Sequence, residues 1–169
     1  MWFPEFWPDG GLYPEGTKER YIPHKSTYEK YLNDKTHKFL PNYPISVILE
    51  LVNRCNLECT FCYQGYRNDA KKATLSEDNL KRLFADFKKN KLDAPLLSPS
   101  EPLLYKNFTQ ILKMAEEAEI MDQFIFTNGT LLDEKNSKVL LNSSFTRVFI
   151  SFDAATRETY DQVRIPVGK

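Results

Sequence analysis

Short apolar runs and amphipathic stretches take turns along most of the chain after residue 45. Runs rich in Val, Ile, Leu and Phe predict four buried strands, over Ser46–Val52, Ala94–Ser98, Gln123–Thr127 and Arg147–Phe152. After these runs, apolar residues recur at three- and four-residue spacing, as they do at Leu80, Leu83, Phe84 and Phe87. This spacing places the apolar residues on one face of a helix. The chain therefore alternates predicted strands with predicted helices.

The residues before the amphipathic stretches are typical of helix starts. Thr74 or Ser76 is a suitable N-cap for the first helix. We expect further helices over Lys106–Glu119, from Asp133 toward Leu141, and from Thr156 to about Arg164, with Pro166 and Gly168 ending the last one. Strands that alternate with helices predict βαβ units, a parallel sheet and right-handed crossovers. The predicted fold class is α/β.

Residues 1–44 have a different composition. They are rich in proline and aromatic residues, and six prolines are expected to break any long element there. A short helix over Tyr28–Leu32 is the one element predicted. We interpret residues 1–44 as an N-terminal extension packed on the body, either a hydrophobic wrap or a lid, and residues 45–169 as the core domain.

Composition narrows the function classes. The chain has 169 residues, 41% of them hydrophobic, and its 23 Lys and Arg balance its 23 Asp and Glu. This balance does not favour a nucleic-acid or membrane-surface partner. No apolar run approaches the roughly 20 residues of a membrane span, and the start of the chain lacks the basic region of a signal peptide. Its odd, clustered set of cysteines differs from a secreted disulfide framework, so we expect a cytoplasmic protein.

All three cysteines, Cys55, Cys59 and Cys62, follow the first predicted strand in a C-x-x-x-C-x-x-C pattern. Three thiolates this close together can surround one soft metal centre. A [4Fe–4S] cluster normally takes four cysteines, so three would leave one iron without a protein ligand. An open coordination position distinguishes a catalytic metal site from a structural one.

The ends of the other predicted strands also carry polar residues. Glu101 follows the second strand, Thr127 and Asn128 end the third, and Ser151 and Asp153 end the fourth. Ligands bind at the carboxyl ends of parallel strands in α/β folds. The pattern therefore predicts one site at this edge of the sheet.

Several stretches together resemble the radical S-adenosylmethionine (radical SAM) enzymes. The cysteine loop, with Phe61 before its last cysteine, is similar to the family's cluster loop, and Ser98–Leu104 is similar to its Gly-Gly-Glu-Pro stretch. Phe126–Gly129, and Ile150–Asp153 with Arg164 eleven residues on, match its third- and fourth-strand motifs. The resemblance covers residues 45–165.

The resemblance implies cofactors and residue roles. It assigns the cysteines to a [4Fe–4S] cluster, Phe61 to the SAM adenine, Glu101 to the SAM amino group, and Ser151 and Arg164 to its carboxylate or ribose. It implies that the SAM-binding residues are Phe61, Ser100, Glu101, Thr127, Asn128, Ser151, Asp153 and Arg164. One departure is that Pro99 and Ser100 stand where the family usually has two glycines, which allow close backbone approach and positive φ.

The resemblance also implies an activity and an architecture. The reduced cluster cleaves SAM to a 5′-deoxyadenosyl radical, which takes hydrogen from a substrate, and we expect that substrate to be a peptide, a protein or a biosynthetic intermediate. An electron donor such as flavodoxin or ferredoxin is implied. The family's core is a partial TIM-type (β/α) barrel of six units. About four are expected here, so the core is expected to be incomplete at its C-terminus.

Other interpretations of the same residues remain. The cysteines could bind zinc with His24 or His37 as fourth ligand, or they could be free or form disulfides. Glu101 could be a solvated loop acid, Thr127 to Gly129 a plain turn, Ser151 and Asp153 helix caps, and Arg164 a surface charge. The whole chain could be a non-catalytic fragment, or an interaction module that keeps a cluster or zinc site.

Overall fold

The computed structural model describes residues 18–36, 38–66, 73–92, 95–97, 99–144 and 147–168. The chain divides into two compact units, residues 1–45 and residues 46–169. Each unit is described by itself. The division of the sequence at residue 44 into an extension and a core domain stays a prediction.

The first unit contains one helix, α1 (Lys18–Asn33), in its described part. It is much longer than the predicted helix over Tyr28–Leu32, and it includes Pro23. The expectation that the prolines break any long element in this region is therefore wrong at Pro23. Proline removes one backbone donor, and Pro23 is the sixth residue of α1, beyond the first four N–H groups that have no intrahelical acceptor, so the helix continues through it with one backbone hydrogen bond lost. The Thr27 hydroxyl donates to the Pro23 carbonyl at 2.9 Å.

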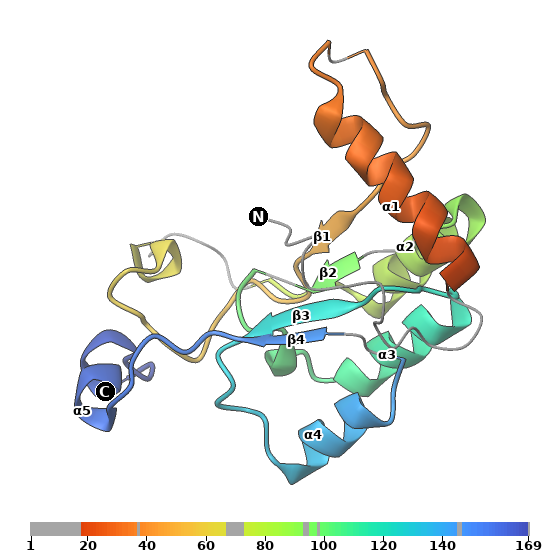
Figure 1. Cartoon of the computed structure of the whole chain (residues 1–169). Coiled ribbons are helices and arrows are strands. Elements are labelled where there is room, and N and C mark those ends of the chain that lie inside the picture. Colours follow the sequence, from red (N-terminus) through yellow and green to blue (C-terminus); the bar gives the residue numbers. More distant parts are fainter. Residues whose placement is uncertain are drawn as a thin grey trace. The chain divides into compact units, whose positions relative to one another are not determined.

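The second unit is built on a sheet of four parallel strands in the order β1-β2-β3-β4 (Figure 1). The strands are β1 (Val47–Leu49), β2 (Pro95–Leu97), β3 (Phe124–Thr127) and β4 (Arg147–Ile150). Leu49 pairs with Leu97, and Ile125 pairs with Val148. The predicted parallel α/β arrangement is confirmed. The strands are shorter than their apolar runs, and Ala94 and Ser98 lie outside the described residues.

Helices follow the strands as predicted. They are α2 (Glu77–Asn90), α3 (Phe108–Glu117), α4 (Glu134–Leu141) and α5 (Arg157–Val163), with the short 3₁₀ helices η2 (Tyr63–Tyr66) and η3 (Pro102–Leu104). The hydroxyl or carboxylate of Ser76, Asp133 and Thr156 caps α2, α4 and α5. Ser76, and not Thr74, is thus the cap of α2. None of the helices in the described part of the chain is long and apolar enough to cross a membrane.

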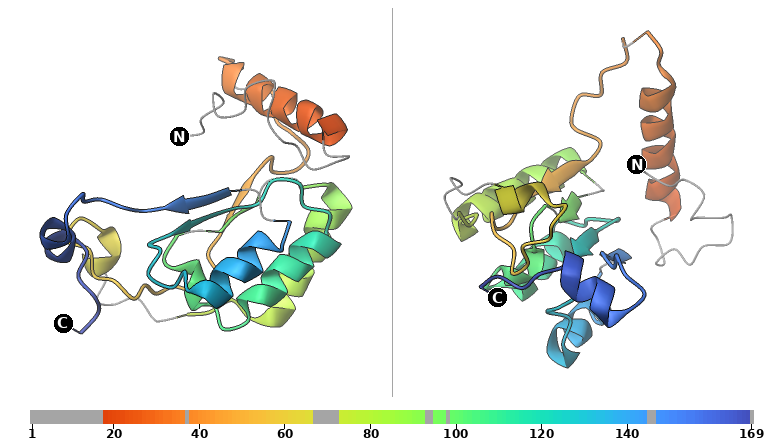
Figure 2. Two further views of the ribbon diagram at one scale, coloured as in Figure 1. Left: turned by 60° about the horizontal axis from the view of Figure 1, so that its bottom comes forward. Right: turned by 90° about the vertical axis from the view of Figure 1, so that its left-hand side faces the viewer.

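The core lies on one face of the sheet. Leu49, Leu97 and Ile125 are neighbours in register and are buried. The α3 and α4 helices lie on one side of the strands in Figure 1 and in the left view of Figure 2. The α2 helix buries Leu80, Phe84 and Phe87. The helices cover this face of the sheet, so a ligand cannot bind there. The carboxyl ends of the strands and the loops that follow them remain accessible for a binding site.

The opposite face of the sheet is more open. Ile48 is 66% exposed and Phe126 is 38% exposed. Phe126 stacks on Phe149 with ring centroids 4.6 Å apart, and Phe149 meets Phe124 edge to face. The three rings are in contact along this face, from Phe124 at the start of β3 to Phe126 near its carboxyl end.

Candidate functional site

The cysteine loop follows β1 and is held by a segment from the other end of the unit. The Glu58 and Thr60 N–H groups donate to the carbonyls of Ile165 and Val163, at 2.6 and 3.0 Å, and Val167 N–H donates to the Asn56 carbonyl at 3.1 Å. These backbone bonds form a short antiparallel pairing beyond the sheet. The pairing places the end of α5 beside the cysteine loop.

The three thiols open into one cavity of about 270 Å³ at the carboxyl ends of the strands. Its walls include all but one of the residues predicted from the sequence: Cys55, Cys59, Phe61, Cys62, Ser100, Glu101, Thr127, Asn128, Ser151 and Arg164. Leu57, Tyr63, Gln64, Pro99 and Phe126 complete the lining. The structure therefore brings together side chains from four strand ends, which is what a shared site requires.

Glu101 forms the buried polar centre of this cavity. It precedes η3, and it is fully buried. Its Oε1 accepts from the Thr127 hydroxyl at 2.8 Å and from Leu103 N–H at 3.2 Å, and its Oε2 accepts from Asn128 N–H at 2.8 Å. Burial raises the pKa of Glu101, while these hydrogen bonds act in the opposite direction. Glu101 is not the solvated loop acid of the alternative interpretation.

Arg164 is buried at the cavity wall and forms an ion pair with Asp153. Its guanidinium also lies over the Phe61 ring, 5.5 Å from the centroid. Asp153, whose side chain is 41% exposed, does not line the cavity, but it accepts a hydrogen bond from Arg164, which does. Arg164 is therefore not a surface charge, and Asp153 is the one predicted site residue outside the cavity wall.

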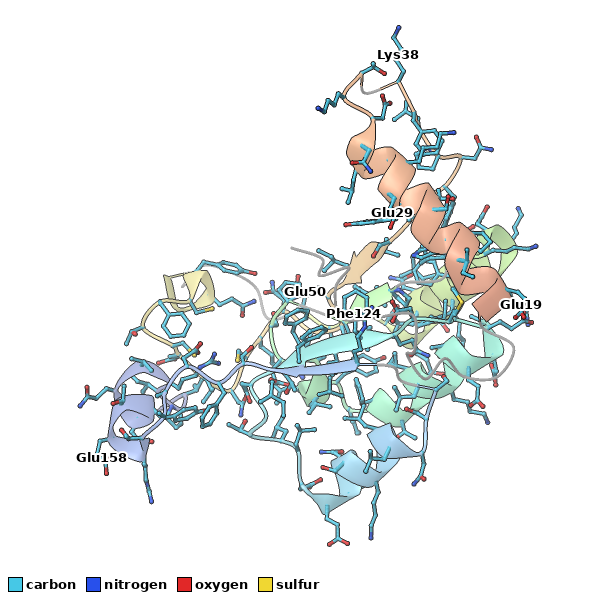
Figure 3. The ribbon with its side chains drawn as sticks, viewed as in Figure 1. Glu19, Glu29, Lys38, Glu50, Phe124 and Glu158 are labelled. Atoms are coloured by element: carbon cyan, nitrogen blue, oxygen red, sulfur yellow. The ribbon has the colours of Figure 1, made fainter. Side chains whose placement is uncertain are left out.

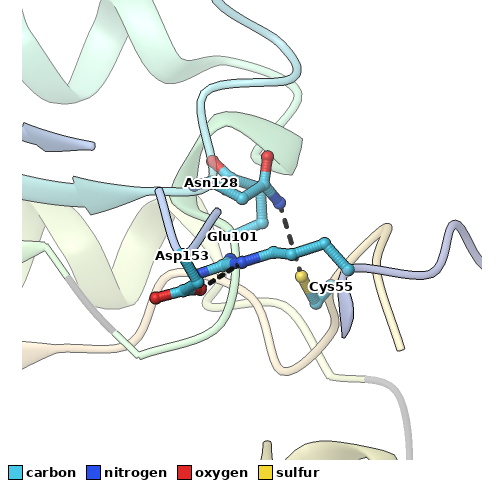
Figure 4. Close-up of polar contacts among 5 residues, drawn as sticks. Cys55, Glu101, Asn128 and Asp153 are labelled. Carbon is cyan, nitrogen blue, oxygen red and sulfur yellow. Dashed lines mark hydrogen bonds and ion pairs between the residues drawn. The ribbon is translucent and has the colours of Figure 1, made fainter. Parts of the chain in front are cut away.

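The thiols are free, and their surroundings differ. Cys59 is buried, whereas Cys55 and Cys62 are half-buried. Burial raises the pKa of Cys55, against hydrogen bonds from Leu57 N–H and Asn128, and burial also raises the pKa of Cys59, against the nearby Arg164. Figure 4 shows the contact between Asn128 and Cys55. The disulfide alternative does not describe these cysteines.

The donor set fits a cluster. Soft thiolates suit zinc and iron–sulfur centres. Within the ranges that the structure describes, no three His, Cys, Asp or Glu side chains are placed to hold a single metal ion, yet three thiols line one cavity. His37 lies outside the described residues and His24 lies on α1 in the first unit, so a histidine ligand is untested.

Comparison with known proteins identifies the family. The model of the radical SAM superfamily matches residues 49–168, which is most of the chain. The chain belongs to the radical SAM superfamily. Proteins of this superfamily use a [4Fe–4S] cluster and SAM. Members of this superfamily that are similar to this chain are enzymes.

Two curated relatives illustrate the match. The chain is 27% identical over 117 residues to a probable GTP 3′,8-cyclase of Methanococcus maripaludis, covering 69% of this chain and 39% of that protein. It is 28% identical over 120 residues to the PqqA peptide cyclase of Rhodopseudomonas palustris, covering 71% of this chain and 32% of that protein.

A similar solved structure is SuiB of Streptococcus suis, bound to S-adenosylmethionine. The TM-score is 0.61 at 20% identity, covering 94% of this chain and 36% of SuiB. A second SuiB structure, bound to the precursor peptide SuiA, has the same TM-score and covers 98% of this chain. These likenesses show the radical SAM fold. The chain spans less than two fifths of the length of each of these relatives.

Ser100 shows how this radical SAM chain accommodates its departure from the glycine pair. Its φ is +70°, in the left-handed region that favours glycine. Its hydroxyl donates to Glu50 Oε1 at 2.8 Å and accepts from Gln64 Nε2 at 2.6 Å. Glu50, labelled in Figure 3, and Gln64 were both missed from the sequence. A charged residue in the apolar strand run was the available signal for Glu50, and Gln64 offered none.

Proposed function

We propose that this chain forms the cofactor site of a radical SAM enzyme, in which Cys55, Cys59 and Cys62 hold a [4Fe–4S] cluster and the adjoining cavity binds SAM. The observation that carries the proposal is the single cavity lined by the three thiols together with Glu101, Asn128, Ser151 and Arg164. Three thiolates leave one iron of a cluster without a protein ligand, and SAM is the ligand that the family supplies there.

A cluster held by Cys55, Cys59 and Cys62 would supply the electron for reductive cleavage of SAM, and the cleaved SAM would supply the radical chemistry that removes hydrogen from the substrate. The chain's own residues bind and orient. An ionised carboxylate offers about four acceptor positions, and three on Glu101 are taken by the chain. The remaining position on Oε2 suits the SAM ammonium.

The carboxylate or ribose of SAM is assigned to the wall formed by Ser151 and Arg164. Arg164 supplies planar N–H donors that match a carboxylate, and its pairing with Asp153 fixes their direction. Phe61, 58% exposed, offers its ring to the adenine. Phe126 adds an apolar surface on the open face of the sheet.

The substrate is proposed to be a peptide, a protein or a biosynthetic intermediate. The SuiB structure with a precursor peptide and the PqqA peptide cyclase support a peptide, and the GTP cyclase supports a small metabolite. The proposal includes a six-unit partial barrel, of which the four strands are a part, a flavodoxin- or ferredoxin-type electron donor, and a cytoplasmic location that suits reduced thiolates.

Anaerobic reconstitution with iron and sulfide, followed by dithionite reduction and electron paramagnetic resonance, tests the proposal. We expect a [4Fe–4S]⁺ signal that shifts when SAM is added, and 5′-deoxyadenosine among the products. A variant with all three cysteines replaced by alanine is the control and should show neither. Stoichiometric zinc, or a cluster signal that ignores SAM, would contradict the proposal and favour a non-catalytic module.

A further inference from the structure

Asn128 lies at the end of β3 with its side-chain amide between two parts of the site. It is buried. Its Nδ2 donates to Cys55 Sγ at 3.6 Å and to Asn56 Oδ1 at 2.9 Å. The neighbouring backbone N–H of Asn128 is already used by Glu101. The side chain thus contacts a proposed cluster ligand, while the backbone holds the proposed SAM-binding acid.

The direction of the Asn128 amide follows from its other partners. Thr130 N–H lies 2.9 Å from Oδ1 of Asn128, and an N–H group can bond only to an oxygen there. The Thr130 hydroxyl donates to the same oxygen at 2.6 Å. The opposite end of the amide, facing Cys55 and Asn56, must therefore be the nitrogen.

A closed ring of hydrogen bonds fixes this arrangement. The Thr130 hydroxyl, having donated to Asn128, accepts from Asn56 Nδ2 at 2.8 Å. The oxygen of Asn56 then faces Asn128 and accepts one of its two N–H groups. The other N–H is left for the Cys55 sulfur. Each member of the ring determines the orientation of the next, so the donor to the sulfur cannot turn away without breaking several bonds.

The three thiols differ in this respect. Cys55 Sγ also accepts from Leu57 N–H at 3.4 Å, so two N–H groups point at it. In the part of the chain that the structure describes, the sulfurs of Cys59 and Cys62 have no N–H donor of this kind. Hydrogen bonds to ligand sulfurs help set the potential of an iron–sulfur cluster. Outer contacts of this type orient and tune metal ligands.

We infer that Asn128 is a positioning residue that raises the reduction potential of the cluster through a fixed N–H···S hydrogen bond to Cys55. The inference rests on the proposed function, because it needs a cluster on the three cysteines. Reduction adds one electron and therefore negative charge to the cluster and its thiolates. An N–H donor stabilises that charge more in the reduced state than in the oxidised one, so removing the donor makes reduction harder.

The test is a potentiometric titration of the reconstituted full chain without SAM, with reduction followed by electron paramagnetic resonance. Asn128→Ala should lower the ratio of reduced to oxidised cluster at a fixed potential by about tenfold, which for one electron is a shift of about 59 mV to more negative potential. Because SAM is absent, a contact between Asn128 and SAM cannot contribute to the measured potential.

Thr130→Ala is the matched control. It removes the hydroxyl from the same ring, but leaves the Thr130 backbone N–H that orients Asn128. Because the ring helps to hold the Asn128 amide but the N–H···S bond itself is kept, the ratio of reduced to oxidised cluster should fall by much less than tenfold. An equal shift in both variants, or no shift in Asn128→Ala, would overturn the inference.

Asn128→Asp is the second variant. It keeps the size and the acceptor for Thr130 while replacing the donor, and it should shift the potential in the same direction as Asn128→Ala. If neither Asn128 variant binds four irons while Thr130→Ala does, Asn128 serves cluster assembly and the inference is overturned. Failure of the proposed function is distinguishable, because the wild type would then show no cluster, or one that ignores SAM.

Discussion

Glu101 and the cysteines share one cavity, but the chain holds them by different means. The Glu101 carboxylate is fully buried and accepts three hydrogen bonds, two from the end of β3 and one from η3. The cysteines lie on a loop tied by backbone bonds to residues 163–167, and two of their thiols are half-buried. We call Glu101 and its donors Leu103, Thr127 and Asn128 the acid side of the site; protein hydrogen bonds alone hold it in place.

The cysteine side differs because the thiols are not gathered around a point in the described residues. Metal binding energy is commonly used to order the ligands of such sites. We therefore expect the acid side to behave as part of the protein core, and the cysteine side to respond to the cluster. Each prediction below tests one side of this comparison.

The largest effect is expected at the cysteines. Replacing Cys55, Cys59 or Cys62 singly by alanine should abolish cluster binding, because loss of even an outer contact of a metal site costs about 10–100-fold in affinity, and a direct ligand costs more. Iron and sulfide analysis after reconstitution measures this. Thr60→Ala, in the same loop, should bind a full cluster. A Cys59 variant that retains four irons would place the cluster elsewhere.

Glu101→Ala should destabilise the metal-free protein. The change leaves the donors of Leu103, Thr127 and Asn128 without their acceptor, and a buried unsatisfied group costs about 1–3 kcal/mol. Since the Thr127 hydroxyl can turn to another acceptor, we expect a loss of about 2–4 kcal/mol in unfolding free energy by urea denaturation. Glu58→Ala, an exposed acid on the cysteine loop, should change stability little. Equal effects would refute the comparison.

The pH dependence of Glu101→Gln sharpens the same point. Burial raises the pKa of Glu101 above its ordinary 4.5, so the folded protein takes up this proton at higher pH than the unfolded chain. The stability of the wild type relative to Glu101→Gln should therefore rise as pH falls from 7, and level off below 4.5.

Glu77→Gln is the matched control for that titration. Hydrogen bonds from Lys81 and Gln110 lower the pKa of Glu77 below 4.5. The stability of the wild type relative to this variant should fall as pH drops below 4.5. Urea unfolding between pH 3 and pH 7 gives both curves, and slopes of the same sign would show that Glu101 does not titrate as a buried acid.

The two sides of the cavity also differ in how much of their structure could be predicted from the sequence. The apolar runs predicted the strands, and short-range signals predicted the caps at Ser76, Asp133 and Thr156. Because parallel strands end at one edge, Glu101 and Asn128 could be placed together before the structure was known. These predictions depend on local period and on topology, both of which are written along the chain.

Contacts that depend on the path of a loop could not be predicted. The antiparallel pairing of residues 56–60 with 163–167 joins segments that have no strand pattern. The hydrogen-bond ring of Asn56, Asn128 and Thr130 needs that loop in place before its members meet. The full extent of the helix over Lys18–Asn33 was missed because Pro23 and its tyrosines obscure any amphipathic period beyond the predicted Tyr28–Leu32.

The smallest effect is expected at Ser100, where both sides meet. At its φ of +70° a side chain costs about 1 kcal/mol that glycine does not, while the Ser100 hydroxyl regains about as much by bonding Glu50 and Gln64. Ser100→Gly should therefore change stability by less than about 1 kcal/mol, and Ser100→Ala, which keeps the strain and loses both bonds, should be the least stable.

Ser137, inside α4, reverses that order and serves as the control. In a helix interior, alanine is more favourable than glycine by about 1 kcal/mol, so Ser137→Ala should be more stable than Ser137→Gly. Urea midpoints of the four variants decide the matter. If alanine were also the better residue at position 100, the backbone there would not be left-handed. The hydrogen bonds of Ser100 would then not be offsetting backbone strain at a position where the family has glycine. The Glu101 side of the cavity would also be less rigid than the comparison with the cysteine loop requires.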